Sequence, residues 1–262
     1  MRDAPFTTDE LTCDDFLGGR ARVWQPRNGY RAGTDPVLLA AAVTAKPGQT
    51  VLELGCGGGP ALVCLGTRVP GLHLTGVELQ PGYADLARRN LAENALDGTI
   101  ETADLTALPG HVRQVQFDHV FANPPYFQAS TRKGATAADR EIALAGQTPL
   151  AQWVEIAAKR LAPGGTATFI QRAERLPELL THFTAHLGSV ELLPLAPRPN
   201  RPPRLILLRG RRAGRAPFRF HAPLILHRAT DHQPDANPYS APVNAVMRDA
   251  AALPFPDDKT PL

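Results

Sequence analysis

Residues 51–59 read Val-Leu-Glu-Leu-Gly-Cys-Gly-Gly-Gly, and this stretch decides the fold. The apolar run from Val51 to Leu54 predicts a short buried strand that the glycines bring to an end. Pro60 suits the first turn of a helix, and residues 61–68 read as that helix. Glycines at such a junction let the backbone turn sharply and approach a ligand, because no Cβ is in the way. The stretch therefore predicts a ligand-binding loop, with a helix N-terminus behind it that favours electronegative groups.

Strand-like and helix-like segments alternate on both sides of this loop. We predict strands at residues 51–54, 72–77, 99–102, 117–122, 166–170, 190–195 and 205–208. We predict helices at residues 61–68, 81–94, 150–161 and 174–187. This order predicts an α/β fold with a seven-stranded, mostly parallel sheet flanked by helices. Such sheets bind ligands at the carboxyl ends of the strands, where the strand order reverses.

The composition indicates one globular domain with terminal extensions. Of the 262 residues, 43% are hydrophobic and 20% are charged, so a sizeable core is available. The three cysteines, Cys13, Cys56 and Cys64, lack metal-ligand spacing and favour a reducing compartment over a disulfide framework. Residues 1–16 lack the pattern of a signal peptide, and no apolar run approaches the ~20 residues that span a bilayer. We expect a cytoplasmic protein without a membrane segment or a metal site.

The glycine spacing distinguishes between classes of cofactor. A dinucleotide loop needs glycine at its first, third and sixth positions, but the sixth position is Pro60 counted from Gly55 and Leu62 counted from Gly57. A phosphate loop of the Walker type needs a following Gly-Lys-Ser/Thr, which this stretch lacks. The remaining pattern, an acid at Glu53 and then alternating glycines, resembles the first motif of class I methyltransferases. Their cofactor, S-adenosylmethionine, has no phosphates.

Two acids follow the next predicted strands. Glu78 closes the second strand, 23 residues after Gly55, where a carboxylate can accept hydrogen bonds from both hydroxyls of a ribose. The alternative for Glu78 is a helix-capping acid before Pro81. Asp104 follows the third strand and either meets an adenine amino group or remains a solvated loop acid. Cys56 is interpreted as a small loop residue, because no histidine is near it in the sequence.

The tetrapeptide Asn123-Pro124-Pro125-Tyr126 ends the fourth predicted strand. The first and fourth strands are expected to be neighbours, so this loop would face residues 55–59, named here the glycine loop, across one crevice. The Asn123 side-chain oxygen and the Pro124 carbonyl oxygen can accept hydrogen bonds from an amino group whose lone pair is delocalised. The prolines stiffen the loop, and the Tyr126 ring offers a stacking surface for a base. We assign Asn123, Pro124 and Tyr126 as the catalytic residues.

The glycine loop, Glu78 and the tetrapeptide together resemble the amino-nitrogen methyltransferases, which include DNA and RNA adenine-N6 enzymes and protein glutamine enzymes. Residues 29–40 are similar to the stretch before the first motif in bacterial methyltransferases that modify N6 of the adenosine 3′ of a tRNA anticodon. Residues 11–19, 25–30 and 224–227 also resemble that family, so the likeness covers roughly residues 10–227. It implies the class I methyltransferase fold, which is Rossmann-like.

The resemblance also implies a cofactor pocket for S-adenosylmethionine. Its residues would be Arg31, Gly33, Thr34, Asp35, Glu53, Gly55, Gly57, Glu78, Asp104 and Asn123. The alternative for residues 31–35 is that this stretch starts a helix, with Thr34-Asp35-Pro36 as its cap. The implied organisation is an N-terminal extension that contributes to the pocket (1–45), the methyltransferase domain (46–210) and a basic, proline-rich C-terminal extension (211–262).

The implied function is methyl transfer to the exocyclic N6 of an adenosine in RNA, the tRNA adenosine 3′ of the anticodon. A protein glutamine N5-methyltransferase of the release-factor or ribosomal-protein type needs the same tetrapeptide and stays open. A non-catalytic RNA-binding protein with this fold is a further alternative, against which the intact Asn123 and Glu78 argue. Residues 198–204 and the polar tail from Asp231, which we expect to be partly irregular, depart from the family and leave target recognition open.

Arginines are concentrated late in the chain, although the net charge is only +3. Residues 192–230 hold nine arginines and no acid, among them Arg209, Arg211, Arg212, Arg215 and Arg219. We expect this stretch to contact tRNA phosphates, so that binding depends on salt. The alternative is an arginine-rich surface typical of high-GC genomes. Arg132 and Lys133, just after Tyr126, would guide the RNA backbone toward the pocket.

Three histidines are interpreted as structural. His182 and His186 lie one helical turn apart, but no third metal ligand is near them in the sequence, which favours a solvated helix face. His119 lies inside the fourth predicted strand and is expected to pack in the core.

Overall fold

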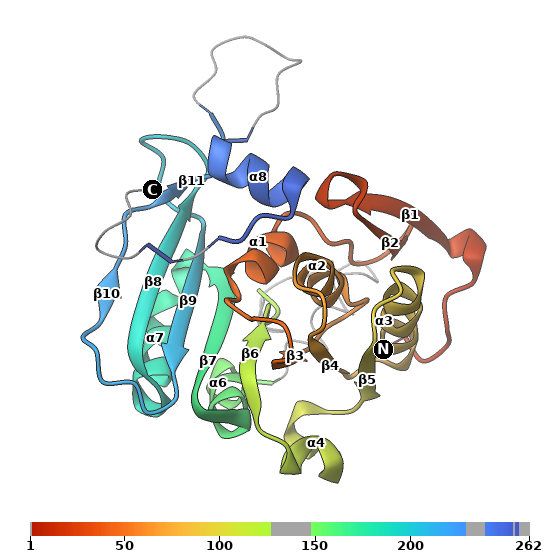
Figure 1. Cartoon of the computed structure of the whole chain (residues 1–262), viewed down its shortest axis with the longest axis horizontal. Coiled ribbons are helices and arrows are strands. Elements are labelled where there is room, and N and C mark those ends of the chain that lie inside the picture. Colours follow the sequence, from red (N-terminus) through yellow and green to blue (C-terminus); the bar gives the residue numbers. More distant parts are fainter. Residues whose placement is uncertain (1, 127–147, 229–238, 254, 257–262) are drawn as a thin grey trace, which may run out of the picture.

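The computed structural model describes residues 2–126, 148–228, 239–253 and 255–256. Within these residues the central sheet has nine strands, shown in Figure 1. They are β3 (Thr50–Leu54), β4 (His73–Glu78), β5 (Gly98–Thr102), β6 (Phe117–Ala122), β7 (Leu161–Arg172), β8 (Gly188–Ala196), β9 (Leu205–Arg211), β10 (Arg219–Phe220) and β11 (Leu224–Ile225). All seven predicted strands are present, and the two-residue strands β10 and β11 bring the number above the prediction.

The strand order reverses at β3. Across the sheet the order is β10-β8-β9-β7-β6-β3-β4-β5, with β11 paired to β8. β3 pairs in parallel with both β4 and β6, and β9 runs antiparallel to β7 and β8. Val51 packs into one core while Leu52 and Leu54 pack into the other. Burial on both faces explains why β3 reads as a continuous apolar run, and the predicted α/β class is confirmed.

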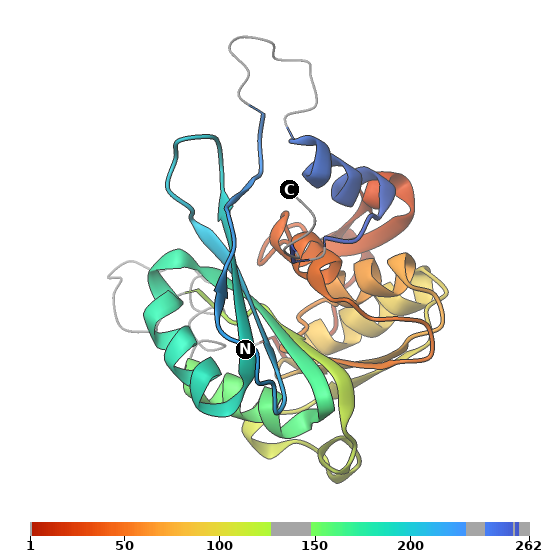
Figure 2. The ribbon, with the colours of Figure 1, turned by 60° about the vertical axis from the view of Figure 1, so that its left-hand side comes forward.

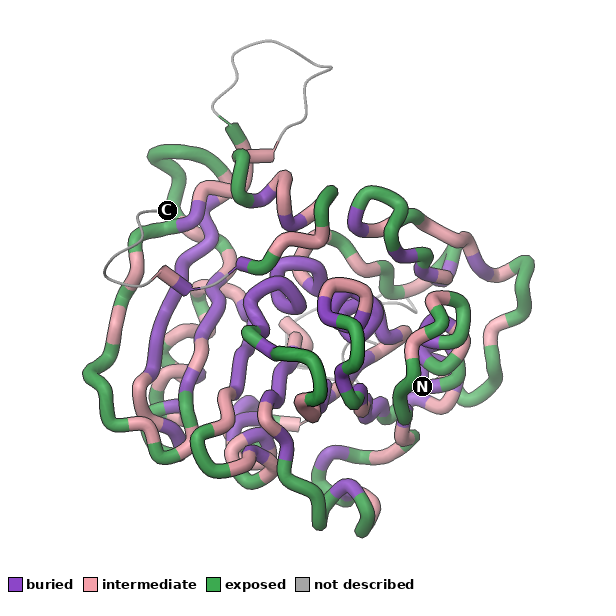
Figure 3. The backbone as a smooth tube through the Cα atoms, viewed as in Figure 1, coloured by how far each residue is buried: buried purple, intermediate pink, exposed green. Residues whose placement is uncertain are grey.

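Helices cover both faces of this sheet. On one face lie α1 (Asp35–Ala42), α2 (Pro60–Arg68) and α3 (Pro81–Glu93); on the other lie α4 (Gly110–Gln114), α6 (Leu150–Arg160) and α7 (Leu176–His186). Figure 2 shows the strands between the two helical layers. In Figure 3 the buried backbone runs along the central strands and through α1 and α2. Ligand-accessible space is therefore expected at the strand ends.

The N-terminal residues add an antiparallel hairpin of β1 (Leu11–Phe16) and β2 (Ala21–Pro26). Asn90 of α3 holds this hairpin in place and is fully buried. Its Oδ1 accepts a hydrogen bond from the Trp24 backbone N–H (2.7 Å), and its Nδ2 donates to the carbonyl oxygens of Trp24 (3.0 Å) and Gly58 (2.8 Å). One side chain thus ties the hairpin and the glycine loop to α3.

The C-terminal residues pack over α1. Helix α8 (Ala241–Asp249) places Val243 and Val246 in the same core as α1. The Leu253 backbone N–H donates a hydrogen bond to the carbonyl oxygen of Ala41 (2.8 Å). Within the tail from Asp231, which was expected to be partly irregular, residues 241–249 form this helix, because valines three positions apart form an apolar stripe on one helix face. No described helix is long and apolar enough to cross a bilayer.

Candidate active site

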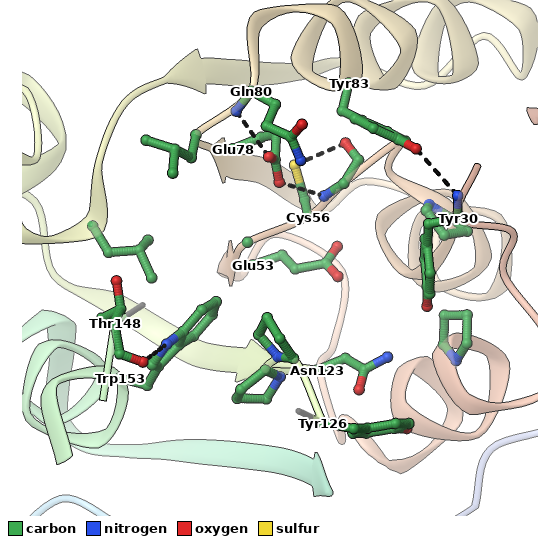
Figure 4. Close-up of a pocket in the computed structure, with 18 of the residues that line it drawn as sticks. Tyr30, Glu53, Cys56, Glu78, Gln80, Tyr83, Asn123, Tyr126, Thr148 and Trp153 are labelled. Carbon is green, nitrogen blue, oxygen red and sulfur yellow. Dashed lines mark hydrogen bonds between the residues drawn. The ribbon is translucent and has the colours of Figure 1, made fainter. Parts of the chain in front are cut away.

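The glycine loop and the Asn-Pro-Pro-Tyr loop meet at the carboxyl edge of the sheet. Leu54 of β3 pairs with Ala122 of β6, so the residues that follow them, Gly55 and Asn123, occupy neighbouring positions. Both border a cavity of about 320 Å³, shown in Figure 4. The predicted residues that line it are Glu53, Gly55, Gly57, Glu78, Asp104, Asn123, Pro124 and Tyr126. A cavity of this size can hold a nucleoside-sized ligand.

Backbone geometry requires glycine at the first loop position. Gly55 has a φ of +65°, and a Cβ built there would lie 2.5 Å from the Cη2 atom of Trp153. Gly57 has a φ of +54°, and a Cβ there would meet no atom within 4 Å. A side chain at Gly55 would therefore collide with the pocket wall, and one at Gly57 would enter the open space that a ligand can occupy.

Glu78 braces the glycine loop from the end of β4. Its Oε2 accepts a hydrogen bond from the Gly57 backbone N–H (2.9 Å), and its Oε1 accepts one from the Gln80 backbone N–H (2.9 Å). Burial raises the pKa of this carboxyl group, and the backbone donors oppose that shift. The N-cap of α3 is Gln80, so Glu78 does not occupy the helix-capping position that was its alternative interpretation.

Glu53 has a buried oxygen without a partner. The residue is 3% exposed, and its Oε2 forms no hydrogen bond with the described part of the chain. Burial raises the pKa of the carboxyl group well above its ordinary value. Since burying such an oxygen without a partner is costly, this wall of the cavity suits a ligand that brings a positive charge or a hydrogen-bond donor.

Asn123, which lines the cavity, carries a second buried oxygen without a partner. Its Oδ1 is buried and makes no hydrogen bond within the residues that the structure describes. The adjacent Pro124 carbonyl oxygen accepts a hydrogen bond from Nε2 of Gln171 in β7 (3.2 Å). A carbonyl oxygen has two lone pairs, so it can accept a second hydrogen bond. The tetrapeptide thus offers two oxygen acceptors next to the glycine loop.

Tyr126 is held from two directions. Its hydroxyl donates a hydrogen bond to Oδ2 of Asp35, the first residue of α1. The Arg172 guanidinium lies over the ring, 5.3 Å from its centroid. Burial and the Asp35 carboxylate raise the pKa of the hydroxyl, which therefore stays protonated and donates. Figure 4 shows the Tyr126 ring at the same end of the cavity as Asn123.

Asp104 lines the cavity but also has a structural task. The residue is exposed, and its Oδ1 caps a short 3-10 helix by accepting hydrogen bonds from the N–H and the hydroxyl of Thr106 (both 2.8 Å).

Cys56 is buried within the glycine loop, and burial raises the pKa of its thiol well above the ordinary value. A neutral buried thiol agrees with the interpretation of Cys56 as a small loop residue.

Four residues of the expected cofactor set do not line the cavity: Arg31, Gly33, Thr34 and Asp35. Arg31 forms an ion pair with Asp14 of the hairpin (2.5 Å). Thr34 is the N-cap of α1, which agrees with the helix alternative for this stretch. The cavity is lined instead by the flanking residues Tyr30 and Pro36. The N-terminal extension thus contributes to the pocket through residues just before and just after the expected positions in the sequence.

The apolar walls of the cavity were not identified from the sequence. They include Tyr30, Leu79, Leu105 and Trp153. Leu79 is 38% exposed and directly follows Glu78, and an apolar residue after a strand-terminal acid is a signal that would have marked it. Trp153 lies on α6, far along the chain from the glycine loop, and no local pattern connects the two.

Three arginines that were expected to contact RNA have structural partners. Arg209 and Arg219 both pair with the buried Glu191 of β8 (2.9 and 3.0 Å). Arg212 donates a hydrogen bond to the carbonyl oxygen of Leu161. The guanidinium groups of these three arginines hold the last strands to the sheet, and their contact with RNA stays a prediction. Arg132 and Lys133 lie outside the described residues.

Comparisons of the sequence identify the family of this chain. The profile of the family "Methyltransferase small domain" matches residues 32–193. The chain is 32% identical over 239 residues to the "tRNA1(Val) (adenine(37)-N6)-methyltransferase" of Porphyromonas gingivalis, a match that covers 85% of this chain and 91% of the relative. It is 30% identical over 144 residues to the protein of that name from Haemophilus influenzae, which covers 53% of this chain and 60% of the relative.

Two solved structures share the fold. A predicted O-methyltransferase, Atu636 from Agrobacterium tumefaciens, superimposes with a TM-score of 0.67 at 24% identity, over 84% of this chain and 99% of that chain. The 16S rRNA N2 G1207 methyltransferase of T. thermophilus, solved with AdoMet and guanosine, gives a TM-score of 0.52 at 22% identity, over 77% of this chain and 50% of that chain. The fold is that of the class I methyltransferases.

The cavity fits the cofactor of that fold, S-adenosylmethionine. Glu53 supplies an unpartnered acidic oxygen for a cationic ligand, Gly57 leaves open space, and the apolar walls suit a purine ring. The protein is thus an S-adenosylmethionine-dependent N-methyltransferase. With the profile matched over more than half of its length, the chain belongs to the methyltransferase small-domain family and, within it, to the bacterial tRNA (adenine-N6) methyltransferases.

Proposed function

We propose that this protein methylates the exocyclic N6 of adenosine 37 in a tRNA, the nucleotide 3′ of the anticodon. The observation that carries the proposal is the buried, unpartnered Oδ1 of Asn123 on the wall of the cavity that also contains the glycine loop. The printed names of the curated relatives support adenosine 37 of a tRNA as the substrate.

The tetrapeptide matches the chemistry of an adenine amino group. N6 is a weak nucleophile, because the ring delocalises its lone pair. The Asn123 Oδ1 and the Pro124 carbonyl oxygen would accept the two N–H groups, favour a tetrahedral nitrogen and stabilise the positive charge that develops there. Gln171 holds the second acceptor in advance, so little reorganisation is needed. The proton that N6 loses passes to water.

The rest of the lining would bind the cofactor. Bound S-adenosylmethionine supplies an electrophilic methyl group on a sulfonium. Glu53 would face the positive charge of its methionine part, and Glu78 would accept hydrogen bonds from the ribose hydroxyls. Leu79 and Leu105 would flank the adenine ring of the cofactor.

Tyr126 would hold the substrate base. Its ring cannot turn freely, because the hydroxyl is bonded to Asp35 and Arg172 lies over the ring. The face of the ring opposite Arg172 would stack on the adenine once that base leaves its neighbours in the anticodon loop.

Methyl transfer from labelled cofactor to total tRNA tests this function. We expect RNase to abolish the incorporated label, and mass spectrometry of digested tRNA to show N6-methyladenosine 3′ of the anticodon. Asn123→Ala should lower kcat about a hundredfold or more while the Kd for cofactor changes less than about threefold, because it removes an acceptor that acts in the transition state. Gln152→Ala removes an exposed amide from α6 and should leave kcat unchanged.

Other outcomes would contradict the proposal. Label that survives RNase and is lost on proteolysis would identify a protein glutamine substrate. Cofactor and tRNA binding without any transfer would support the non-catalytic alternative.

A further inference from the structure

Residues 197–204, Pro-Arg-Pro-Asn-Arg-Pro-Pro-Arg, join β8 to β9 and are named here the arginine-proline loop. The loop lies at the carboxyl edge of the sheet, where the active site is also found. Its last residue precedes Leu205, which pairs with Arg172 at the end of β7. Figure 2 shows the loop projecting beyond the ends of β8 and β9.

A short chain of contacts connects this loop with the site. The carbonyl oxygen of Arg204 accepts a hydrogen bond from the Ala173 backbone N–H (2.9 Å). Ala173 follows Arg172, whose guanidinium lies over the ring of Tyr126. The loop therefore begins to project next to the residues that would hold the target base.

The charges of the loop are exposed and unpaired. Arg198, Arg201 and Arg204 are all exposed, and none of their guanidinium groups forms an ion pair or a hydrogen bond with a described residue. They differ in this from Arg209 and Arg219, which share Glu191. The loop itself contains no acid, so its positive charge is not neutralised locally.

The backbone of the loop is stiff. Four of its eight residues are prolines, which fix φ. Backbone hydrogen bonds join Arg201 N–H to the Arg198 carbonyl (3.2 Å), Arg204 N–H to the Leu195 carbonyl (3.3 Å) and His227 N–H to the Pro197 carbonyl (3.1 Å). Arginines on such a backbone lose little main-chain freedom when they bind a partner.

We propose that the arginine-proline loop binds the phosphates of the substrate RNA beside the target nucleotide. This inference rests on the proposed function. Guanidinium groups match phosphate oxygens in a bidentate geometry, and such contacts fix the position of the RNA without reading its sequence. The loop would thus bring the anticodon stem-loop to the site, while the tetrapeptide selects the amino group.

The opposite edge of the sheet provides a matched control. Arg211 of β9 pairs with Thr166 of β7, which lies away from the carboxyl end of β7. Arg211 is therefore at the amino edge of the sheet. Arg211 and Arg215 are exposed and form no ion pair with the described residues. Because they lie at the edge opposite the cavity, this proposal replaces the earlier expectation that these two arginines contact tRNA phosphates. The double variants Arg198→Glu/Arg201→Glu and Arg211→Glu/Arg215→Glu change the net charge equally, so only the position of the charge differs.

The test compares both double variants with the wild-type chain in filter binding of tRNA across a salt series, in methylation kinetics and in cofactor binding. For Arg198→Glu/Arg201→Glu we expect the Kd and KM for tRNA to rise about tenfold or more, with kcat at saturating tRNA within about twofold of wild type. The slope of log K against log salt should fall by about 1.4 to 1.8, since each of the two lost phosphate contacts removes about 0.7 to 0.9. Unchanged cofactor affinity in all three proteins shows that the variants are folded.

Equal effects of the two double variants, or an unchanged salt slope in Arg198→Glu/Arg201→Glu, would overturn the inference. A wild-type chain that binds tRNA but does not methylate it would contradict the proposed function alone. The comparison of tRNA binding between the two double variants would still test the role of the arginine-proline loop. A wild-type chain that does not bind tRNA would overturn the loop proposal directly.

Discussion

The side-chain amide of Gln171 links β7 to the tetrapeptide by donating a hydrogen bond from Nε2 to the Pro124 carbonyl oxygen (3.2 Å). The same amide accepts the Arg172 backbone N–H at its Oε1 (2.9 Å), which fixes its orientation. Gln171 is fully buried, so the loss of either contact would leave a buried polar group without a partner. It is therefore a positioning residue for one of the two oxygen acceptors.

Gln171→Met should lower kcat for methyl transfer about tenfold, because the Pro124 carbonyl loses the donor that holds it and small displacements are costly in the transition state. The Kd for cofactor should stay within about threefold, because Gln171 does not line the cavity. Gln152→Met makes the same exchange on the surface of α6 and serves as the control. Steady-state kinetics that determine kcat and KM separately test this prediction. An unaltered kcat would show that the hydrogen bond from Gln171 to Pro124 does not contribute to methyl transfer.

Gly55→Ala should destabilise the chain by about 2 to 4 kcal/mol, since the positive φ alone costs about 1 to 2 kcal/mol and the new methyl group meets the Trp153 ring. Gly110→Ala adds the same atom at the start of α4, where a Cβ meets nothing within 4 Å, and should change stability by less than about 0.5 kcal/mol. Denaturant unfolding of the two variants measures the difference. Equal losses would refute the role assigned to the glycine loop geometry.

Glu53 should make cofactor binding depend on pH. Burial raises its pKa, so the free protein holds this carboxyl protonated at pH values where an exposed carboxyl group is ionised, and a cationic cofactor favours the ionised form. Affinity should therefore rise as the pH increases toward the raised pKa of Glu53, by up to about tenfold per pH unit, and binding should release a proton. Glu53→Gln should bind more weakly with a flat pH dependence. Calorimetry in two buffers of different protonation enthalpy measures the proton release, and identical profiles for both proteins would contradict the assignment.

His119 should make the fold sensitive to acid. It is 7% exposed, with Nδ1 2.8 Å from the Thr166 hydroxyl and Nε2 3.1 Å from the Gln49 side-chain oxygen, and burial lowers its pKa to about 4. Between that value and the ordinary 6.5, the unfolded chain binds a proton that the folded chain does not, so stability falls as the pH falls. The full effect is about 3 kcal/mol. Denaturant unfolding at pH 7 and pH 4.5 should show a larger loss for wild type than for His119→Gln, and parallel losses would argue against this role.

The elements with a local signal were predictable from the sequence. β3 was expected at residues 51–54 and is found at 50–54, and α6 was expected at 150–161 and is found at 150–160. A strand buried on both faces leaves an unbroken apolar run in the sequence, and a helix with one buried face leaves apolar residues at helical spacing. β10 and β11 leave none, because they have two residues each and exist through their pairing with β8.

The same distinction applies to the site. The rule that ligands bind where strand order reverses was enough to place Gly55 opposite Asn123, as the β3–β6 register shows. Trp153 and Gln171 approach the loops only through the packing of α6 and β7, which no local pattern encodes. The partners of Arg209 and Arg219 were hidden for the same reason, because Glu191 precedes the arginine-rich stretch and meets them only in the folded sheet.

The position of α1 has a consequence for how the protein is made. All seven residues of α1 after Asp35 are buried, and part of their cover is α8, from near the other end of the chain. A nascent chain emerging from the ribosome exposes this apolar helix until the C-terminal residues have been translated. Because Asp35 also anchors Tyr126, the packing of α8 against α1 supports the Asn-Pro-Pro-Tyr loop as well.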